Sequence, residues 1–150
     1  MNRFSERTLG ILTKAGWHPE RKVDVSATLS FLESRDFQVS TPVKEALERF
    51  GGLVCEFLDG GEGENFIIIP ESQFREGVTK VHFKRYDVLI GEYLIVIGSV
   101  YRENALLFMS DSGKVYGAHD DYYIWKFGDN IDEAISNLCE CQEFKLIHQE

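Results

Sequence analysis

A glycine pair, Gly51-Gly52, separates two parts of the chain with different apolar periods. Before the pair, apolar residues recur at helical spacing, whereas from Leu53 onward short β-rich runs alternate with turn residues. An amphipathic helix needs a period of about 3.6 residues and a half-buried strand a period of 2, so one pattern does not serve both. We therefore expect N-terminal helices followed by a sheet, which is the order of the α+β class.

The first third of the chain predicts three helices. Ser5 can cap a helix that runs to Lys14 with Leu9 and Leu12 inward, and Gly16 lies where a left-handed residue would end it. Two further helices are indicated by apolar residues at i, i+4 and i+7, namely Val25, Leu29 and Leu32, then Val43, Leu47 and Phe50. Thr41 is the expected cap of the third helix, Pro42 its first residue, and Gly51-Gly52 its end.

The remaining two-thirds predict an antiparallel meander. We expect a hairpin of strands 53–57 and 66–69 with the loop 59–65 between them, and then strands 93–101, 105–110 and 115–117 joined by tight turns. Residues 79–91 predict a short helix that ends at Gly91, with one inward side formed by Val81, Tyr86 and Leu89 or Ile90.

A closing helix is predicted after Asp129, its expected cap, with Ile131, Ala134, Ile135 and Leu138 inward. Phe144, Leu146 and Ile147 would then dock on the fold. The expected structure is an α+β fold with N-terminal helices packed on a mostly antiparallel sheet and a C-terminal closing helix. At 150 residues the whole chain fits a single domain.

Negative charge is concentrated after residue 50. Residues 1–50 hold 8 Lys/Arg against 7 Asp/Glu, residues 51–100 hold 4 against 8, and residues 101–150 hold 4 against 10. The negative electrostatic potential of such a surface repels phosphates, so direct binding to nucleic acid or anionic lipid is disfavoured. A basic protein would be attracted. A merely solubilising acidic surface would have the same composition.

The sequence indicates a cytoplasmic location. The opening residues lack the apolar stretch of a signal peptide, and no run approaches the roughly 18 apolar residues of a membrane helix. The three cysteines are Cys55, Cys139 and Cys141, an odd number that includes a C-x-C pair, so disulfides are not expected.

No catalytic or metal-binding pattern stands out. His18, His82, His119 and His148 are scattered, and Cys139 falls on the inward side of the closing helix, where a packing role is favoured over a zinc site. The glycine-rich loop 60–63 is flanked by acids rather than by the lysine of a phosphate-binding loop. We therefore expect no cofactor, no metal and no catalytic residue.

Two segments keep a functional alternative open. His119-Asp120-Asp121 places a base beside carboxylates, which would suit a small hydrolase or a ligand-binding enzyme, although a polar loop is the simpler interpretation. The run 122–127, Tyr-Tyr-Ile-Trp-Lys-Phe, is explained as a buried strand with either parity inward and one exposed tyrosine, or as an interface anchored by Tyr122 or its neighbours and ringed by acids.

The order of several motifs resembles the third subgroup of the SUKH superfamily of bacterial immunity proteins. The motifs are Phe4-Ser5, Ala15-Gly16-Trp17, the stretch 21–25, Phe37-x-Val39, Glu48-x-Phe50-Gly51-Gly52-Leu53, the strand 94–98 and Asp111-x-Gly113-x-Val115-Tyr116. Ile95-Val96-Ile97-Gly98 lacks the proline that the subgroup usually has there, and Ser99 replaces its usual acid. The resemblance implies an α+β immunity protein, with no catalytic set, that binds a toxin made beside it, often a nuclease.

From charge and resemblance together we expect an antitoxin that occludes the active site of a basic toxin with an acidic surface. A regulatory scaffold would share the binding role. The candidate partner-binding residues are Asp59, Glu62, Glu64, Asp111, Asp120, Asp121 and Tyr122.

Overall fold

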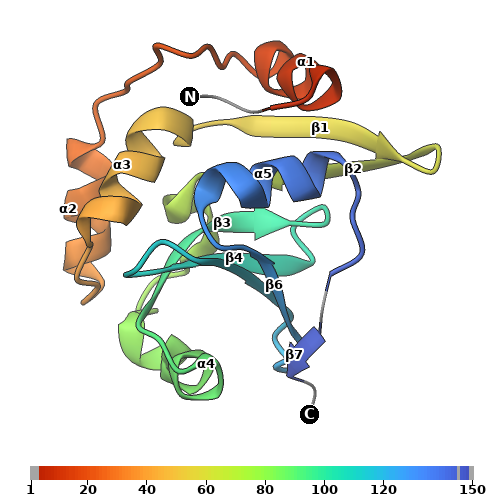
Figure 1. Cartoon of the computed structure of the whole chain (residues 1–150). Helices are drawn as coiled ribbons and strands as arrows, with labels where there is room; N and C mark the ends of the chain where they lie inside the picture. Colours follow the sequence, from red (N-terminus) through yellow and green to blue (C-terminus); the bar gives the residue numbers. More distant parts are fainter. Residues whose placement is uncertain (1–3, 145, 149–150) are drawn as a thin grey trace.

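A seven-stranded antiparallel sheet forms the centre of the protein, with its strands in chain order (Figure 1). The computed structural model describes residues 4–144 and 146–148. The strands are β1 Val54–Asp59, β2 Glu62–Ile67, β3 Leu94–Val100, β4 Ala105–Ser110, β5 Val115–Ala118, β6 Ile124–Gly128 and β7 Leu146–His148. Every pairing is antiparallel, and this confirms the predicted meander.

Helices cover both sides of the sheet, and α4 and α5 lie on opposite sides of it (Figure 1). The described residues form α1 Glu6–Lys14, α2 Ser26–Ser34, α3 Thr41–Phe50, α4 Lys84–Ile90 and α5 Ile131–Cys139, with short 3-10 helices at Pro70–Gln73 and Lys80–Phe83. The predicted α+β class, with its closing helix, is confirmed. No helix in the described part of the chain is both long and apolar enough to cross a bilayer.

The N-terminal helices follow the sequence signals to within one residue. Ser5 caps α1, because its side chain accepts a hydrogen bond from the Thr8 backbone N–H at 3.2 Å. The expected Thr41 cap of α3 is wrong: Ser40 holds the cap position, and Thr41 is already helical. The reason is that Ser40 has the extended backbone of a cap residue, so that Pro42 still lies in the first turn, where its missing N–H costs nothing.

The predicted loop 59–65 is shorter than expected. Only Gly60-Gly61 forms the turn, and residues 62–65 belong to β2 with Asp59 paired to Glu62. Both glycines have left-handed backbones, with φ of 59° and 90°, which allows a two-residue hairpin turn. The acidic residues after the turn are therefore held in a strand.

The predicted inward side of residues 79–91 is wrong at Val81. Residues 80–83 form a 3-10 helix before α4, so their side chains do not follow the α-helical spacing. The Val81 side chain is therefore 62% exposed. Lys80 is buried instead, and its ammonium lies 2.7 Å from an Asp87 carboxylate oxygen and 4.3 Å from the Tyr93 ring centroid. Gly91 ends the helix with φ of 84°, as predicted.

The closing helix α5 begins one residue later than expected. The expected Asp129 cap is wrong, because the Asn130 side chain accepts the Glu133 backbone N–H at 2.8 Å and caps α5. Phe144 then docks against Phe127 with ring centroids 4.5 Å apart. A side chain at Gly117 would overlap the Phe127 ring, so this glycine makes room for the contact.

The strand order places the turns at two ends of the sheet. The β1–β2, β3–β4 and β5–β6 turns lie at one end, because alternate connections of an antiparallel meander share an end. We call residues 59–65, 101–104 and 119–123 the hairpin end. The β4–β5 turn lies at the other end with the segment after α4, and we call residues 91–93 and 110–116 the network end.

Candidate partner-binding surface

Six of the seven candidate residues lie at the hairpin end, and five of them are acids. Asp59 and Glu62 face each other across the β1–β2 turn, and Glu64 follows on the same face of β2. Asp120 and Asp121 occupy the β5–β6 turn and are exposed. Within the described chain, none of these five carboxylates forms an ion pair with a protein cation.

Hydrogen bonds join the three turns of the hairpin end into one surface. The Tyr101 N–H donates to the Asn65 carbonyl at 3.1 Å, and the Arg102 N–H donates to the Asn65 side chain at 3.1 Å. On the other side, His119 Nδ1 lies 2.7 Å from the Asn104 carbonyl. The β3–β4 turn thus connects both acidic turns, so their charges act on one surface.

Asp111 lies apart from the other candidates, at the network end. It is exposed in the β4–β5 turn, where a neighbouring acid, Glu92, accepts hydrogen bonds from Ser112 and Tyr116, both at 2.6 Å. Burial raises the pKa of Glu92, but these hydrogen bonds and Lys114 at 3.8 Å outweigh it and hold the pKa below its ordinary value. The acid with internal partners here is Glu92.

Tyr122 supports the β5–β6 turn from the α4 side of the sheet. Its ring centroid is 4.8 Å from that of Tyr86, and the Arg85 guanidinium lies 4.9 Å from its centre on the ring face. The residue has a left-handed backbone, with φ of 64°. The expected exposed anchor is therefore half-buried between two side chains of its own protein.

Four aromatic residues on the opposite face of the sheet form what we call the aromatic platform: Tyr101, His119, Tyr123 and Trp125. Trp125 is central, with ring centroids 5.7 Å from Tyr101, 5.0 Å from His119 and 5.0 Å from Tyr123. All four side chains are half-buried. Burial, followed by the charges of Glu64 and Asp59, raises the pKa of Tyr101 to about 12, so the platform borders the acids.

The sequence interpretation treated the platform residues as strand core, with the exception of His119. The period-2 alternation of Tyr123 and Trp125 was a sufficient signal that they share a face, but not that this face stays open. Tyr101 and its neighbour Glu103 were missed, because they lie in a turn of three left-handed residues. Tyr101, Arg102 and Glu103 have φ of 54°, 56° and 67°, a strained conformation without glycine.

His119, the base of the alternative enzyme hypothesis, has structural contacts on two sides. Its Nδ1 lies within hydrogen-bond distance of the Asn104 carbonyl, which as an acceptor requires the proton on this nitrogen. Its own carbonyl accepts the Tyr86 hydroxyl at 2.9 Å. The geometry makes His119 a connection between turns.

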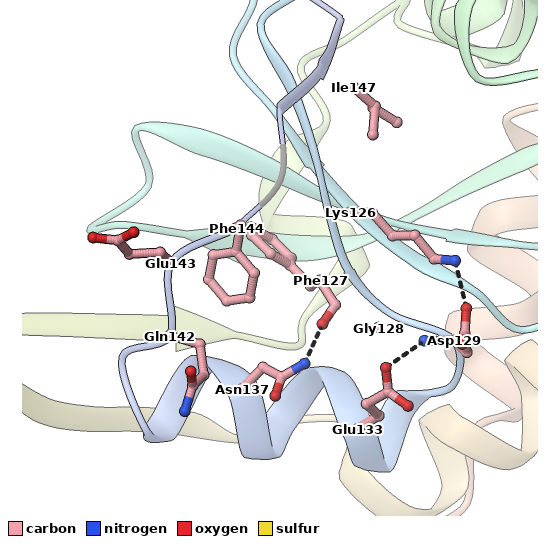
Figure 2. A pocket seen from close by; sticks show the side chains of 10 residues that line it. All are labelled: Lys126, Phe127, Gly128, Asp129, Glu133, Asn137, Gln142, Glu143, Phe144 and Ile147. Carbon is pink, nitrogen blue, oxygen red and sulfur yellow. Dashed lines mark hydrogen bonds and ion pairs between the residues drawn. The ribbon is translucent and has the colours of Figure 1, made fainter.

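The hollow drawn in Figure 2 lies between α5, β6 and the C-terminal segment, with a volume of about 500 Å³. Figure 2 shows Phe127 and Phe144 in its wall, the Asn137 amide donating to the Phe127 carbonyl at 2.8 Å, and Lys126 paired with Asp129. Neither His119 nor any candidate partner-binding residue lines it. Lys126, Asp129, Glu133 and Asn137 in its wall form bonds within the wall.

Two of the three cysteines are buried, and the described residues contain no cluster of metal ligands. Residues 4–144 and 146–148 contain no group of three or more His, Cys, Asp or Glu side chains placed to hold a metal ion. Cys55 and Cys139 are buried, and burial raises the pKa of each thiol to about 12. Both stay protonated at neutral pH, which fits the packing role expected for Cys139.

A comparison with protein families identifies the chain. The family model for SUKH-3 immunity proteins matches residues 4–141. The chain belongs to this family. The matched range includes the whole hairpin end and the whole network end. The SUKH-3 assignment confirms the resemblance seen in the sequence and indicates an immunity protein.

Two other comparisons add no relative of this SUKH-3 protein. No curated protein and no solved structure matches the chain. The assignment of a surface therefore depends on the geometry of this molecule.

Proposed function

We propose that this SUKH-3 protein binds and neutralises a cognate toxin through its hairpin end. The observation that carries the proposal is the gathering of Asp59, Glu62, Glu64, Asp120 and Asp121 on two turns that hydrogen bonds join through a third, without ion pairs in the described chain. Carboxylates without an ion pair in the described chain remain available to the cations of an incoming protein.

The partner that this surface favours is a basic toxin domain, and a nuclease is the natural example. An enzyme that binds phosphates has Lys and Arg around its active site. Their positive charge attracts acidic side chains as well as phosphates. We infer that the hairpin end covers such a site and excludes the substrate. Charge complementarity would mainly raise the association rate, while aromatic contacts would supply affinity.

The remaining parts of the proposal follow from the same surface. Residues 1–150 would act as a single immunity domain in the cytoplasm, without a catalytic step and without direct binding to nucleic acid. Asp111 and Tyr122 are omitted from the proposed contact, because one lies at the network end and the other faces α4.

Co-expression with the toxin domain encoded beside this chain tests the function. We expect the wild-type protein to restore growth and to co-purify with the toxin. Asp59→Asn, Glu62→Gln, Asp120→Asn and Asp121→Asn combined should lose most of this protection.

A matched control removes four exposed acids elsewhere: Glu33→Gln, Asp36→Asn, Glu45→Gln and Asp111→Asn. It changes the net charge equally and should protect as well as the wild type. Toxicity undiminished by the wild-type protein would refute the function, and equal loss in the control would refute the location.

A further inference from the structure

We propose that the aromatic platform, together with Glu64, is a guanidinium-binding surface that receives an arginine side chain of the toxin. This inference deepens the proposed function and rests on it. The contact lies within the hairpin end, and the group of the partner is a guanidinium.

The geometry of the platform suits a flat cation. Trp125 presents its ring between Tyr101 and Tyr123, at centroid distances of 5.7 and 5.0 Å and interplanar angles of 73° and 64°. Trp125 also stacks on Phe127 at 6.5 Å, yet all three platform rings are only half-buried, so part of each faces solvent. A guanidinium can lie against one ring face while the neighbouring rings border it.

Apart from His119, which is bonded to Asn104, the platform residues have polar groups without partners among the described residues. Three of the six tyrosines use their hydroxyls inside the fold: Tyr86 donates to the His119 carbonyl, Tyr93 accepts from the Gln38 N–H, and Tyr116 donates to Glu92. The Tyr101 and Tyr123 hydroxyls and Trp125 Nε1 form no such bond with any described residue, and none of the three is buried. Half-buried aromatic residues with free polar groups are typical of interface anchors.

Glu64 supplies the charge that selects a cation. It lies close enough to Tyr101 for its charge to raise the pKa of that hydroxyl, after the larger effect of burial. Its Oε1 atom is buried and accepts no hydrogen bond from the described residues. The charge of this carboxylate beside Tyr101 favours a cation over an anion at the platform.

Arginine fits this surface better than lysine. Its planar guanidinium stacks on aromatic rings and donates several hydrogen bonds at once, whereas the lysine ammonium is a compact and strongly hydrated charge. An acidic or phosphate-bearing partner would meet Glu64, Asp59 and Glu62 and be repelled. The occupant is therefore an arginine-bearing segment of a basic toxin.

Peptide titration followed by NMR tests the inference on the intact protein. The probes are two decapeptides of equal charge, five Gly-Arg repeats and five Gly-Lys repeats. We expect the arginine peptide to bind about three- to fivefold more tightly, the range that a cation–π contact supplies. It should shift the Trp125 indole N–H signal and leave that of buried Trp17 unchanged.

Two neighbouring residues provide the matched variants. Tyr123→Leu removes one wall of the platform and should abolish the preference for arginine. Tyr122→Leu changes the adjacent residue on the opposite face of the sheet and should keep it. Circular dichroism of both variants separates lost binding from lost folding, and Glu64→Gln provides an independent weakening of about threefold or more.

Several outcomes would overturn the inference. Equal affinity for the two peptides would mean that the surface senses charge alone, and absence of binding would mean that it is not a cation site. A Trp125 signal that shifts on concentrating the protein by itself would identify a second copy of the chain as the occupant. Toxin neutralisation by Tyr123→Leu at the wild-type level would also contradict it, while leaving the proposed immunity function intact.

Discussion

At the network end of the sheet, the Glu92 carboxylate accepts two hydrogen bonds at 2.6 Å and has a lysine nearby. At the hairpin end, five carboxylates on connected turns have no ion pair within the described chain. Both ends are acidic, yet only the first uses its charge to hold turns together. Local acid content alone therefore does not separate a structural acid from a free one, and it is the acids without ion pairs that we propose as the binding surface.

Charge reversal at the hairpin end should have the largest effect. Glu62→Lys combined with Asp121→Lys should slow association with the toxin about 10- to 100-fold at low salt, because it replaces attraction with repulsion. Stopped-flow measurements over a range of salt concentrations would show the effect shrinking as salt rises. An unchanged association rate would remove the distinction between the two ends.

Loss of the Glu92 charge should reduce stability instead of binding. At pH 7, Glu92→Gln should lower the free energy of unfolding by about 1–2 kcal/mol, because it weakens charge-assisted hydrogen bonds. The pKa of Glu92 is lower in the folded protein than its ordinary value of 4.5. Its contribution is therefore present above that value and is lost as the pH falls through the folded pKa.

Urea unfolding of wild type and Glu92→Gln between pH 7 and pH 3 measures this dependence. The difference between the two proteins should be largest near neutrality and should diminish below pH 4.5. A difference that grows on acidification would contradict the account of the network end.

The strained turn of the hairpin end should become more stable when glycine is introduced. Glu103 has φ of 67°, so Glu103→Gly should raise the free energy of unfolding by about 1 kcal/mol or somewhat less, as relief of strain exceeds the added chain entropy. Thermal unfolding would show the gain. A loss of stability would mean that the Glu103 side chain supports the turn.

Asp111→Asn should have the smallest effect of the series. Asp111 is exposed, and no ion pair involves it in the described chain, so the unfolding free energy should change by less than about 0.5 kcal/mol. Calorimetric affinity for the toxin should also stay at the wild-type value. A marked loss of affinity would extend the contact to the network end.

Much of the fold could be predicted from the sequence, because it depends on local signals. Ser5, Gly91 and the apolar spacing of the helices act over one or two turns of chain, and the meander needs only short connections. The errors are similarly local. Ser40 and Asn130 took cap positions expected one residue away, and a 3-10 turn exchanged Val81 for Lys80 on the inward side.

The candidate surface was predicted less completely, since it depends on which turns share an end of the sheet. The acidic residues were visible in the sequence, but the separation of Asp111 from Asp59 and Asp120 follows only from strand order. The orientation of Tyr122 toward Arg85, and of Tyr123 toward Trp125, depends on tertiary contacts. Period-2 alternation indicates two faces without revealing which of them remains uncovered.

Hydrogen–deuterium exchange of the protein with and without its toxin tests the central claim most directly. The account predicts slower exchange in residues 59–65, 101–104 and 119–125 of the complex, with residues 91–93 and 110–116 unchanged. Protection of the network end, with the hairpin end exchanging as in the free protein, would contradict it.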